Sequence, residues 1–228
     1  MCGRATLTVP GAEIAAMFDV DAIDVGPPRF NLAPTQPLLT VRAGGDRREL
    51  AFVRWGLIPW WAKAEEAKKI GSRCVQARSE TAPTSPAYRD AFKKHRCLVV
   101  VDGFYEWQSL PDGKRVPFHV RRADGRPFAI AGLYDRWRTD GTVPANAGDR
   151  VESGAVLTTR ARGELAAVHD RMPLVLVPDT WDTWLRAAPD EARALLKDGD
   201  DDLVVIPVST WVNDVKHDDA ACVAPEER

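Results

Sequence analysis

The chain has 228 residues and a net charge of −2, with 45% hydrophobic and 28% charged residues. This composition is typical of a globular protein with one large or two small domains, and it excludes a disordered chain. No run approaches the ~18 consecutive apolar residues of a membrane-spanning helix, and the N-terminal residues lack the basic and apolar segments of a signal peptide. We therefore expect a cytoplasmic protein without a membrane partner.

The charged residues are distributed unevenly. Residues 1–100 contain 15 Lys and Arg against 10 Asp and Glu, whereas residues 179–228 contain 5 against 13. The near-neutral total is therefore compatible with a local anion-binding face and with an acidic C-terminal tail, which we expect from about residue 214. The asymmetry permits a nucleic-acid partner, and a solvated surface with uneven charge explains it equally well.

The chain begins Met1-Cys2-Gly3-Arg4, and cysteine is small enough for the initiator methionine to be removed. Removal would leave Cys2 with a free α-amine (pKa about 7.7–8.0) and a thiol (pKa about 8.5) on adjacent carbons, both partly deprotonated near neutrality. These two nucleophiles can attack one aldehyde and close a five-membered ring. A cysteine without a chemical role could equally stand near a chain end, so other segments are needed to distinguish the two interpretations.

The other cysteines are Cys74, Cys97 and Cys222. They form no CxxC pair, so the sequence predicts neither a disulfide framework nor a zinc site. Cys74 and Cys97 have apolar or strand-like neighbours and are predicted to lie in the core, whereas Cys222 falls in the acidic tail and has no evident role. Because no phosphate loop, metal cluster or nucleotide fingerprint is present, no cofactor is expected.

Short β-like runs dominate the chain, and turn signals such as Pro111-Asp112-Gly113 and Ala123-Asp124-Gly125 separate several of them. Strands are predicted over 38–42, 50–55, 96–101, 104–108, 116–121, 128–133, 155–159, 174–177 and 203–206. Helices are predicted over 11–18, 63–70, 86–95 and 163–169, with two more within 181–197, and residues 139–151 are predicted to be a polar loop. Because strands outnumber helices and do not alternate with them regularly, we expect an α+β fold. This fold is a single domain with a mostly antiparallel, partly barrel-like sheet flanked by short helices.

Two segments early in the chain are candidates for ligand contact. The turn-rich segment from Asn31 through Pro34 offers amides that could fix a ligand group, although turn and capping roles explain it equally well. Further along, three tryptophans fall within seven residues, and the adjacent Trp60 and Trp61 cannot both point inward from a strand. One of them is expected to face a ligand or partner, and an aromatic face beside basic residues suits base stacking.

Four arginines are further candidates for ligand contact. Arg4, Arg73, Arg78 and Arg171 could supply forked contacts to phosphate.

Glu106 follows an apolar strand in the run Asp102-Gly103-Phe104-Tyr105-Glu106-Trp107. Aromatic neighbours would raise its pKa towards general acid or base use, while a surface glutamate is the plain alternative. His169 ends a predicted helix and can titrate near neutrality, although such a histidine is more often a cap or core residue.

Taken together, these motifs resemble the SRAP family, the SOS-response-associated peptidases or abasic-site processing proteins. They occur in the family's order and cover residues 2 to about 213. The matching segments are Met1-Cys2-Gly3-Arg4, Asn31 with Ala33-Pro34-Thr35-Gln36, Trp55-Gly56-Leu57-Ile58-Pro59 with Trp61, Ala77-Arg78-Ser79-Glu80-Thr81, Arg96-Cys97-Leu98, Asp102-Gly103-Phe104-Tyr105-Glu106-Trp107, Ala131-Gly132-Leu133, His169-Asp170-Arg171-Met172-Pro173, and Ser209-Thr210 with Val212-Asn213.

The resemblance implies a DNA-repair enzyme that recognises abasic sites in single-stranded DNA and crosslinks to them through Cys2. It assigns the acid/base steps to Glu106 and His169, backbone contacts to the arginines and an aromatic wedge to the tryptophan segment. It also implies a cytoplasmic protein that is nucleoid-associated when bound to DNA, and a monomer is the default expectation.

Two positions depart from the family pattern. Arg162 follows Thr158-Thr159-Arg160-Ala161 where asparagine is common in the family, which we interpret as a minor change in a loop or helix start. Gln76 stands where the family usually has asparagine, so the amide sits one methylene further out, which could alter crosslinking rate or sugar placement. Two alternatives therefore stay open: an N-terminal-nucleophile cysteine peptidase that uses Cys2 for acylation, and a non-catalytic binder of single-stranded DNA.

Overall fold

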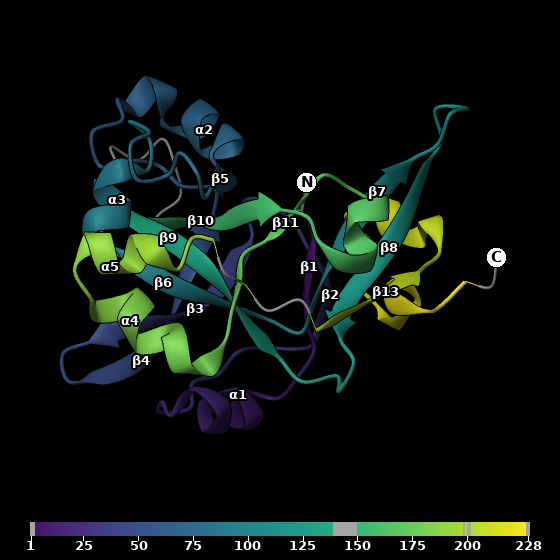
Figure 1. Ribbon diagram of the computed structural model, residues 1–228, viewed down its shortest axis with the longest axis horizontal. Coiled ribbons are helices and arrows are strands. Elements are labelled where there is room, and N and C mark those ends of the chain that lie inside the picture. Colours follow the sequence, from purple (N-terminus) through teal and green to yellow (C-terminus); the bar gives the residue numbers. More distant parts are fainter. Residues whose placement is uncertain (1–2, 139–149, 198, 200–201, 227–228) are drawn as a thin grey trace.

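A computed structural model describes residues 3–138, 150–197, 199 and 202–226 (Figure 1). The strands are β1 (Ala5–Leu7), β2 (Arg29–Leu32), β3 (Pro37–Gly44), β4 (Arg47–Trp55), β5 (Gln76–Arg78), β6 (Arg96–Val101), β7 (Gly103–Ser109), β8 (Arg115–Arg122), β9 (Phe128–Arg138), β10 (Arg150–Arg160), β11 (Arg171–Pro173), β12 (Val175–Leu176) and β13 (Leu203–Pro207). The α-helices are α1 (Gly11–Phe18), α2 (Ala64–Arg73), α3 (Arg89–Lys94), α4 (Trp181–Arg186) and α5 (Pro189–Ala194). Short 3-10 helices are η1 (Gly163–Ala167), η2 (Pro178–Thr180), η3 (Thr210–Asn213) and η4 (Ala220–Val223).

The larger of two sheets closes on itself. Its strands follow the order β11-β10-β4-β3-β6-β9-β12, and because β9 also pairs with β10, the strands β10, β4, β3, β6 and β9 form a barrel. Within the described residues, β10 pairs in parallel with β4 and β5, while the other pairings of this sheet are antiparallel. The predicted α+β fold with a mostly antiparallel, partly barrel-like sheet is thereby confirmed.

The smaller sheet has the order β13-β8-β7-β1-β2 and lies beside the barrel (Figure 1). Strands β7 and β8 form a hairpin whose turn contains the predicted Pro111-Asp112-Gly113 signal. The second turn signal, Ala123-Asp124-Gly125, joins β8 to β9 and so connects the two sheets. A buried apolar cluster fills the barrel and includes Val41, Val99, Leu133 and Leu157.

The acidic C-terminal segment is packed against the smaller sheet. Asp218 accepts hydrogen bonds from the backbone N–H groups of Phe30 (2.6 Å) and Asn31 (2.9 Å) and forms an ion pair with Arg29. Cys222, for which the sequence indicated no role, is fully buried in a cluster with Tyr105, Val208 and Val212. This segment therefore contributes to a small buried cluster, separate from the main core, that includes Tyr105 of β7.

Several predicted boundaries are corrected by the structure. Strands β1, β2, β5 and β11 were not predicted, because segments of three or four residues are too short to show an alternating pattern. The helix expected over 163–169 is a 3-10 helix over Gly163–Ala167. Of the predicted polar loop, residues 139–149 lie outside the described residues, whereas Arg150 and Val151 belong to β10. None of the described helices is long and apolar enough to cross a membrane.

Gly56 allows α2 to approach the end of β4 closely. Its φ is 121°, and a Cβ there would lie 2.4 Å from the backbone carbonyl oxygen of Gly71 in α2. Gly56→Ala is therefore expected to lower the free energy of unfolding by about 3 kcal/mol, since backbone strain and overlap add. In a domain of this size the melting temperature should fall by about 6–12 °C, measured by calorimetry.

Gly45 provides the matched control for this substitution. Its φ is also positive, at 58°, but a Cβ there meets no atom within 4 Å. Gly45→Ala should thus cost only about 1 kcal/mol, from backbone conformation alone. Equal losses in the two variants would show that the approach of α2 to Gly56 is unimportant.

Candidate functional site

Strand β1 brings the start of the chain against β7. Ala5 pairs with Phe104 and Thr6 with Gly103, and the Tyr105 N–H donates to the Arg4 carbonyl at 3.0 Å. The same register places Gly3 opposite Glu106. Cys2 lies outside the described residues, but it is bonded to Gly3, so the candidate site is located by Gly3 and the side chains around it.

A buried carboxylate anchors β1. Asp102 accepts hydrogen bonds from the Thr6 hydroxyl (2.5 Å), from the Thr8 N–H (2.5 Å) and hydroxyl (2.6 Å), and from the Val9 N–H (3.2 Å). Gly103 leaves room for this contact, because a Cβ there would lie 2.2 Å from His119 Nε2 and 2.8 Å from Thr6 Oγ1. The Asp102-Gly103 pair therefore fixes the strand that follows Cys2.

Arg4 is held by the C-terminal segment. Its Nη1 donates to Asn31 Oδ1 (2.8 Å) and to the Val212 carbonyl (2.9 Å), and Nη2 donates to the Asn213 carbonyl (3.3 Å). Burial lowers the pKa of Arg4. Asn31 is fully buried, and its Nδ2 donates to backbone carbonyls of residues 212, 214 and 217. Asn31 thus holds the Arg4 side chain in position. The predicted contact of Asn31 with DNA stays a prediction.

An aromatic pocket lies beside Gly3. The guanidinium groups of Arg4 and Arg115 lie 6.0 Å and 5.8 Å from the Trp107 ring centroid, and the Trp107 Nε1–H donates to Asn213 at 2.7 Å. These four residues and Gly3 line a pocket of about 390 Å³. Arg115 was not anticipated, because only the β7–β8 pairing brings it close to Trp107.

Glu106 is fully buried on β7. Burial raises the pKa of its carboxyl, while the charge of His169 and the backbone N–H of Trp107 oppose this shift. The charge of His169 thus acts on the Glu106 carboxyl, and the acid/base roles of the two residues stay a prediction. A carboxyl with a raised pKa can exchange a proton closer to neutrality than a solvated one.

His169 follows η1 and has a defined tautomer when neutral. Its Nδ1 lies 2.9 Å from the Arg171 backbone nitrogen, and because a backbone N–H can only donate, Nε2 carries the proton. Nδ1 is also 2.8 Å from a carboxylate oxygen of Asp170, a contact that becomes favourable only when Nδ1 is protonated. Asp170 is 84% exposed, whereas the Arg171 backbone N–H is a fixed donor, so the backbone contact decides the tautomer.

Three more of the predicted residues lie on β5 and β11. Gln76 of β5 is half-buried beside β10, and its backbone carbonyl accepts from the Tyr88 hydroxyl at 2.7 Å. Arg78 is exposed on the same strand, and Arg171 of β11 reaches Glu80 and Thr158. These contacts bring Arg78, Arg171 and His169 to one region.

Trp60 and Trp61 are both exposed, at 61% and 44%. Trp60 donates from its backbone to Asp135 (2.9 Å) and from its indole to Asp90 (3.1 Å), so it lies beside α3 and β9 and not on β1 or β7. Arg73 is exposed at the end of α2, and Pro34 is half-buried in the turn after β2. Both tryptophans are thus exposed, whereas the sequence predicted that one of the two would be.

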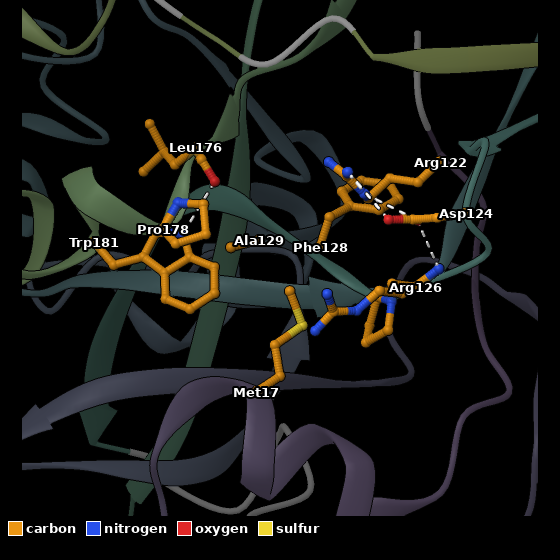
Figure 2. A pocket seen from close by; sticks show the side chains of 10 residues that line it. Met17, Arg122, Asp124, Arg126, Phe128, Ala129, Leu176, Pro178 and Trp181 are labelled. Carbon is orange, nitrogen blue, oxygen red and sulfur yellow. Dashed lines mark hydrogen bonds and ion pairs between the residues drawn. The ribbon is translucent and has the colours of Figure 1, made fainter.

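A pocket outside this region lies between α1, α4 and the turn after β8 (Figure 2). Its volume is about 210 Å³, and its lining combines apolar side chains such as Met17, Phe128 and Trp181 with the charged side chains of Arg122, Asp124 and Arg126. None of the predicted site residues lines it. Among the residues that the structure describes, no group of three or more His, Cys, Asp or Glu side chains is arranged to hold a metal ion.

His119 supports β1 from behind and gives a pH prediction. It is 6% exposed, lies 3.3 Å from Thr6 Oγ1, and burial lowers its pKa to about 4 from an ordinary 6.5. As the pH falls below 6.5, His119 becomes protonated in the unfolded chain, whereas in the folded chain it stays neutral until the pH approaches about 4. The stability that this histidine contributes is therefore complete above pH 6.5 and is lost across this window, by up to about 3 kcal/mol.

His119→Gln should flatten the pH dependence of the free energy of unfolding between pH 7 and 4.5, measured by urea titration. An unchanged dependence in the variant would assign the loss to other groups.

Comparison with known proteins points to one family. A sequence model described as SOS response associated peptidase (SRAP) matches residues 1–215. The abasic site processing protein YoaM of Bacillus subtilis is 35% identical over 233 residues, which cover 99% of each chain. The abasic site processing protein YedK of Escherichia coli is 30% identical, over 99% of this chain and 100% of its own. A crystal structure of a protein from Bacteroides thetaiotaomicron has the same fold, with a TM-score of 0.85 at 21% identity, covering 99% of this chain and 100% of its own.

Proposed function

Because the chain belongs to the SOS response associated peptidase (SRAP) family, we propose that it processes abasic sites in single-stranded DNA by forming a covalent link through Cys2. The observation that carries this proposal is the β1–β7 register, which sets Gly3 opposite the buried Glu106. Gly3, to which Cys2 is bonded, thus lies opposite a carboxyl whose pKa burial raises. The names of the relatives supply the substrate class.

The proposed reaction begins after removal of Met1. The free amine of Cys2 attacks the aldehyde carbon of the ring-opened deoxyribose, and loss of one water gives a Schiff base. The Cys2 thiolate then adds to the same carbon, the nitrogen takes up a proton, and a thiazolidine ring closes. The aldehyde oxygen leaves as water, so atoms and charge balance without an oxidant or cofactor.

Glu106 and His169 are proposed to move the protons. Glu106, with its raised pKa, donates to the departing oxygen and can accept the proton of the amine. Neutral His169 carries its proton on Nε2, and this N–H is proposed to assist opening of the sugar ring. Arg4, Arg78 and Arg171 are proposed to hold phosphates, and Gln76 to contact the sugar with its longer amide.

The pocket at Trp107 supports a single-stranded substrate. Two guanidinium groups lie 6.0 Å and 5.8 Å from the centroid of its indole beside Gly3, an arrangement that suits an unpaired base with neighbouring phosphates. A paired base would have its faces occupied by its own neighbours in the stack.

A crosslinking assay tests the proposal. The protein is incubated with a labelled single strand that carries one abasic site, and separately with the intact strand, and both samples are heated in detergent before electrophoresis. We expect a slowly migrating band only with the abasic strand, with a mass equal to that of the chain lacking Met1 plus DNA minus one water. Binding without a heat-stable band would favour a non-catalytic DNA-binding protein, and cleavage of a peptide bond without a band would favour the peptidase.

A further inference from the structure

The guanidinium of Arg171 is occupied by a carboxylate. Nη1 donates to Glu80 Oε1 at 2.5 Å and Nη2 donates to Glu80 Oε2 at 2.9 Å, so the pair is bidentate. Nη2 also donates to the Thr158 carbonyl at 2.5 Å. The Arg171 side chain is 13% exposed, whereas that of Glu80 is 53% exposed.

Few donors of Arg171 remain for another anion. A guanidinium has five N–H groups, of which three are used in these contacts. A fourth, on Nε, is buried and has no partner among the residues that the structure describes. Only the second N–H of Nη1 is left, so a phosphate could receive a bidentate contact from Arg171 only after Glu80 has moved away.

Glu80 has the properties of a displaceable anion. It lies in the turn directly after β5, close enough to Arg78 for that charge to act on it, and its side chain is more than half exposed. The hydrogen bond from Arg171, together with the charges of Arg171 and Arg78, lowers its pKa, so it is ionised at neutral pH. A carboxylate and a phosphate present similar oxygen pairs to a guanidinium fork.

We propose that Glu80 occupies the position of a DNA phosphate on Arg171 and competes with the strand for it, which sets how weakly the protein holds intact single-stranded DNA. The inference rests on the proposed function for its ligand. Glu80 is then a specificity-determining residue: a passing strand must displace it, whereas a strand that also offers an aldehyde to Cys2 is retained by the covalent step.

The test uses Glu80→Gln, which removes the charge and keeps the shape. Glu13→Gln is the matched control, because it removes the same charge from an exposed position on α1. Affinity for an intact single strand is measured by fluorescence anisotropy over a range of salt concentrations. Glu80→Gln should bind about 3- to 10-fold more tightly, since a competing charge is removed. The plot of log K against log salt should become steeper by about 0.7, as one more arginine is free to neutralise a phosphate.

The same substitution in an Arg171→Ala background should change affinity less than about twofold, because no guanidinium is left to compete for. Weaker binding by Glu80→Gln, or an unchanged salt slope, would overturn the inference and make Glu80 a support that holds Arg171 in place. Intact DNA reports on this contact without any reaction at Cys2. Failure of wild-type protein to crosslink an abasic strand would refute the proposed function separately, and absence of DNA binding by every variant would overturn both.

Discussion

Replacing Cys2 by Ala is expected to abolish the heat-stable product with an abasic strand, while affinity for the intact strand changes less than about twofold. The substitution keeps the α-amine but removes the thiol, so a Schiff base can form and hydrolyse but no ring can close. The measurement is denaturing electrophoresis beside anisotropy on the same samples. A heat-stable band that survives in Cys2→Ala would remove Cys2 from the mechanism.

Cys2→Ser tests whether the α-amine attacks the aldehyde before the thiolate does. Serine retains the amine and a weaker nucleophile, so the reaction should stop largely at the Schiff base, which borohydride reduces to a stable amine. We expect little heat-stable product without the reductant and a strong band with it. If borohydride traps nothing in Cys2→Ser, the amine does not attack first.

Glu106→Gln is expected to slow crosslinking by about 10²- to 10⁴-fold, the usual contribution of a positioned acid or base, with DNA affinity nearly unchanged. Glutamine fills the same buried space on β7 but cannot transfer a proton. The pH–rate profile of the wild type should contain a limb that reports the ionisation of Glu106. This limb should be absent from the profile of the variant. Equal losses of binding and rate would instead make Glu106 structural.

The same variant should be more stable than the wild type. Burial raises the pKa of Glu106, so the folded chain holds this proton more tightly than the unfolded chain does. The stability that Glu106 contributes is present below its unfolded pKa and is lost as the pH rises through its folded pKa. Each unit of the raised pKa is about 1.4 kcal/mol, so Glu106→Gln should unfold at a higher temperature at pH 8, with the gain disappearing towards pH 4. A variant that is slower yet more stable would identify a group kept for chemistry.

The barrel was accessible to sequence reasoning because its strands are long. The run over Arg96–Val101 and the helix over Gly11–Phe18 have the predicted bounds, since an unbroken apolar run and a helical spacing are strong local signals. The three residues of β1 carry no such signal. Their position comes from Asp102, nearly a hundred residues away, through hydrogen bonds that no local pattern encodes.

The sequence proposed members for the candidate site but did not predict the contacts among them. Glu106 and His169 were recognisable from their motifs, and burial accounts for the shifted pKa of Glu106. The pairing of Arg171 with Glu80 was not, because the two residues are 91 positions apart and meet only where β11 and the turn after β5 flank β10. Similarly, the sequence offered Asn31 as a candidate for ligand contact, but no local pattern predicted that it would be buried and accept a hydrogen bond from Arg4.

The hydrogen bonds of the Arg4 guanidinium connect the start of the chain to a segment near its end. Its hydrogen bonds to Val212 and Asn213 span 208 and 209 positions, so a ribosome making about 5–20 residues per second needs roughly 10–40 s between the two ends. During that interval the Arg4 guanidinium lacks the two carbonyl partners that hold it in the folded chain, and a chain that ends before residue 212 never acquires them. Completion of translation is thus required before Arg4 is fully held beside Asn31 and Trp107.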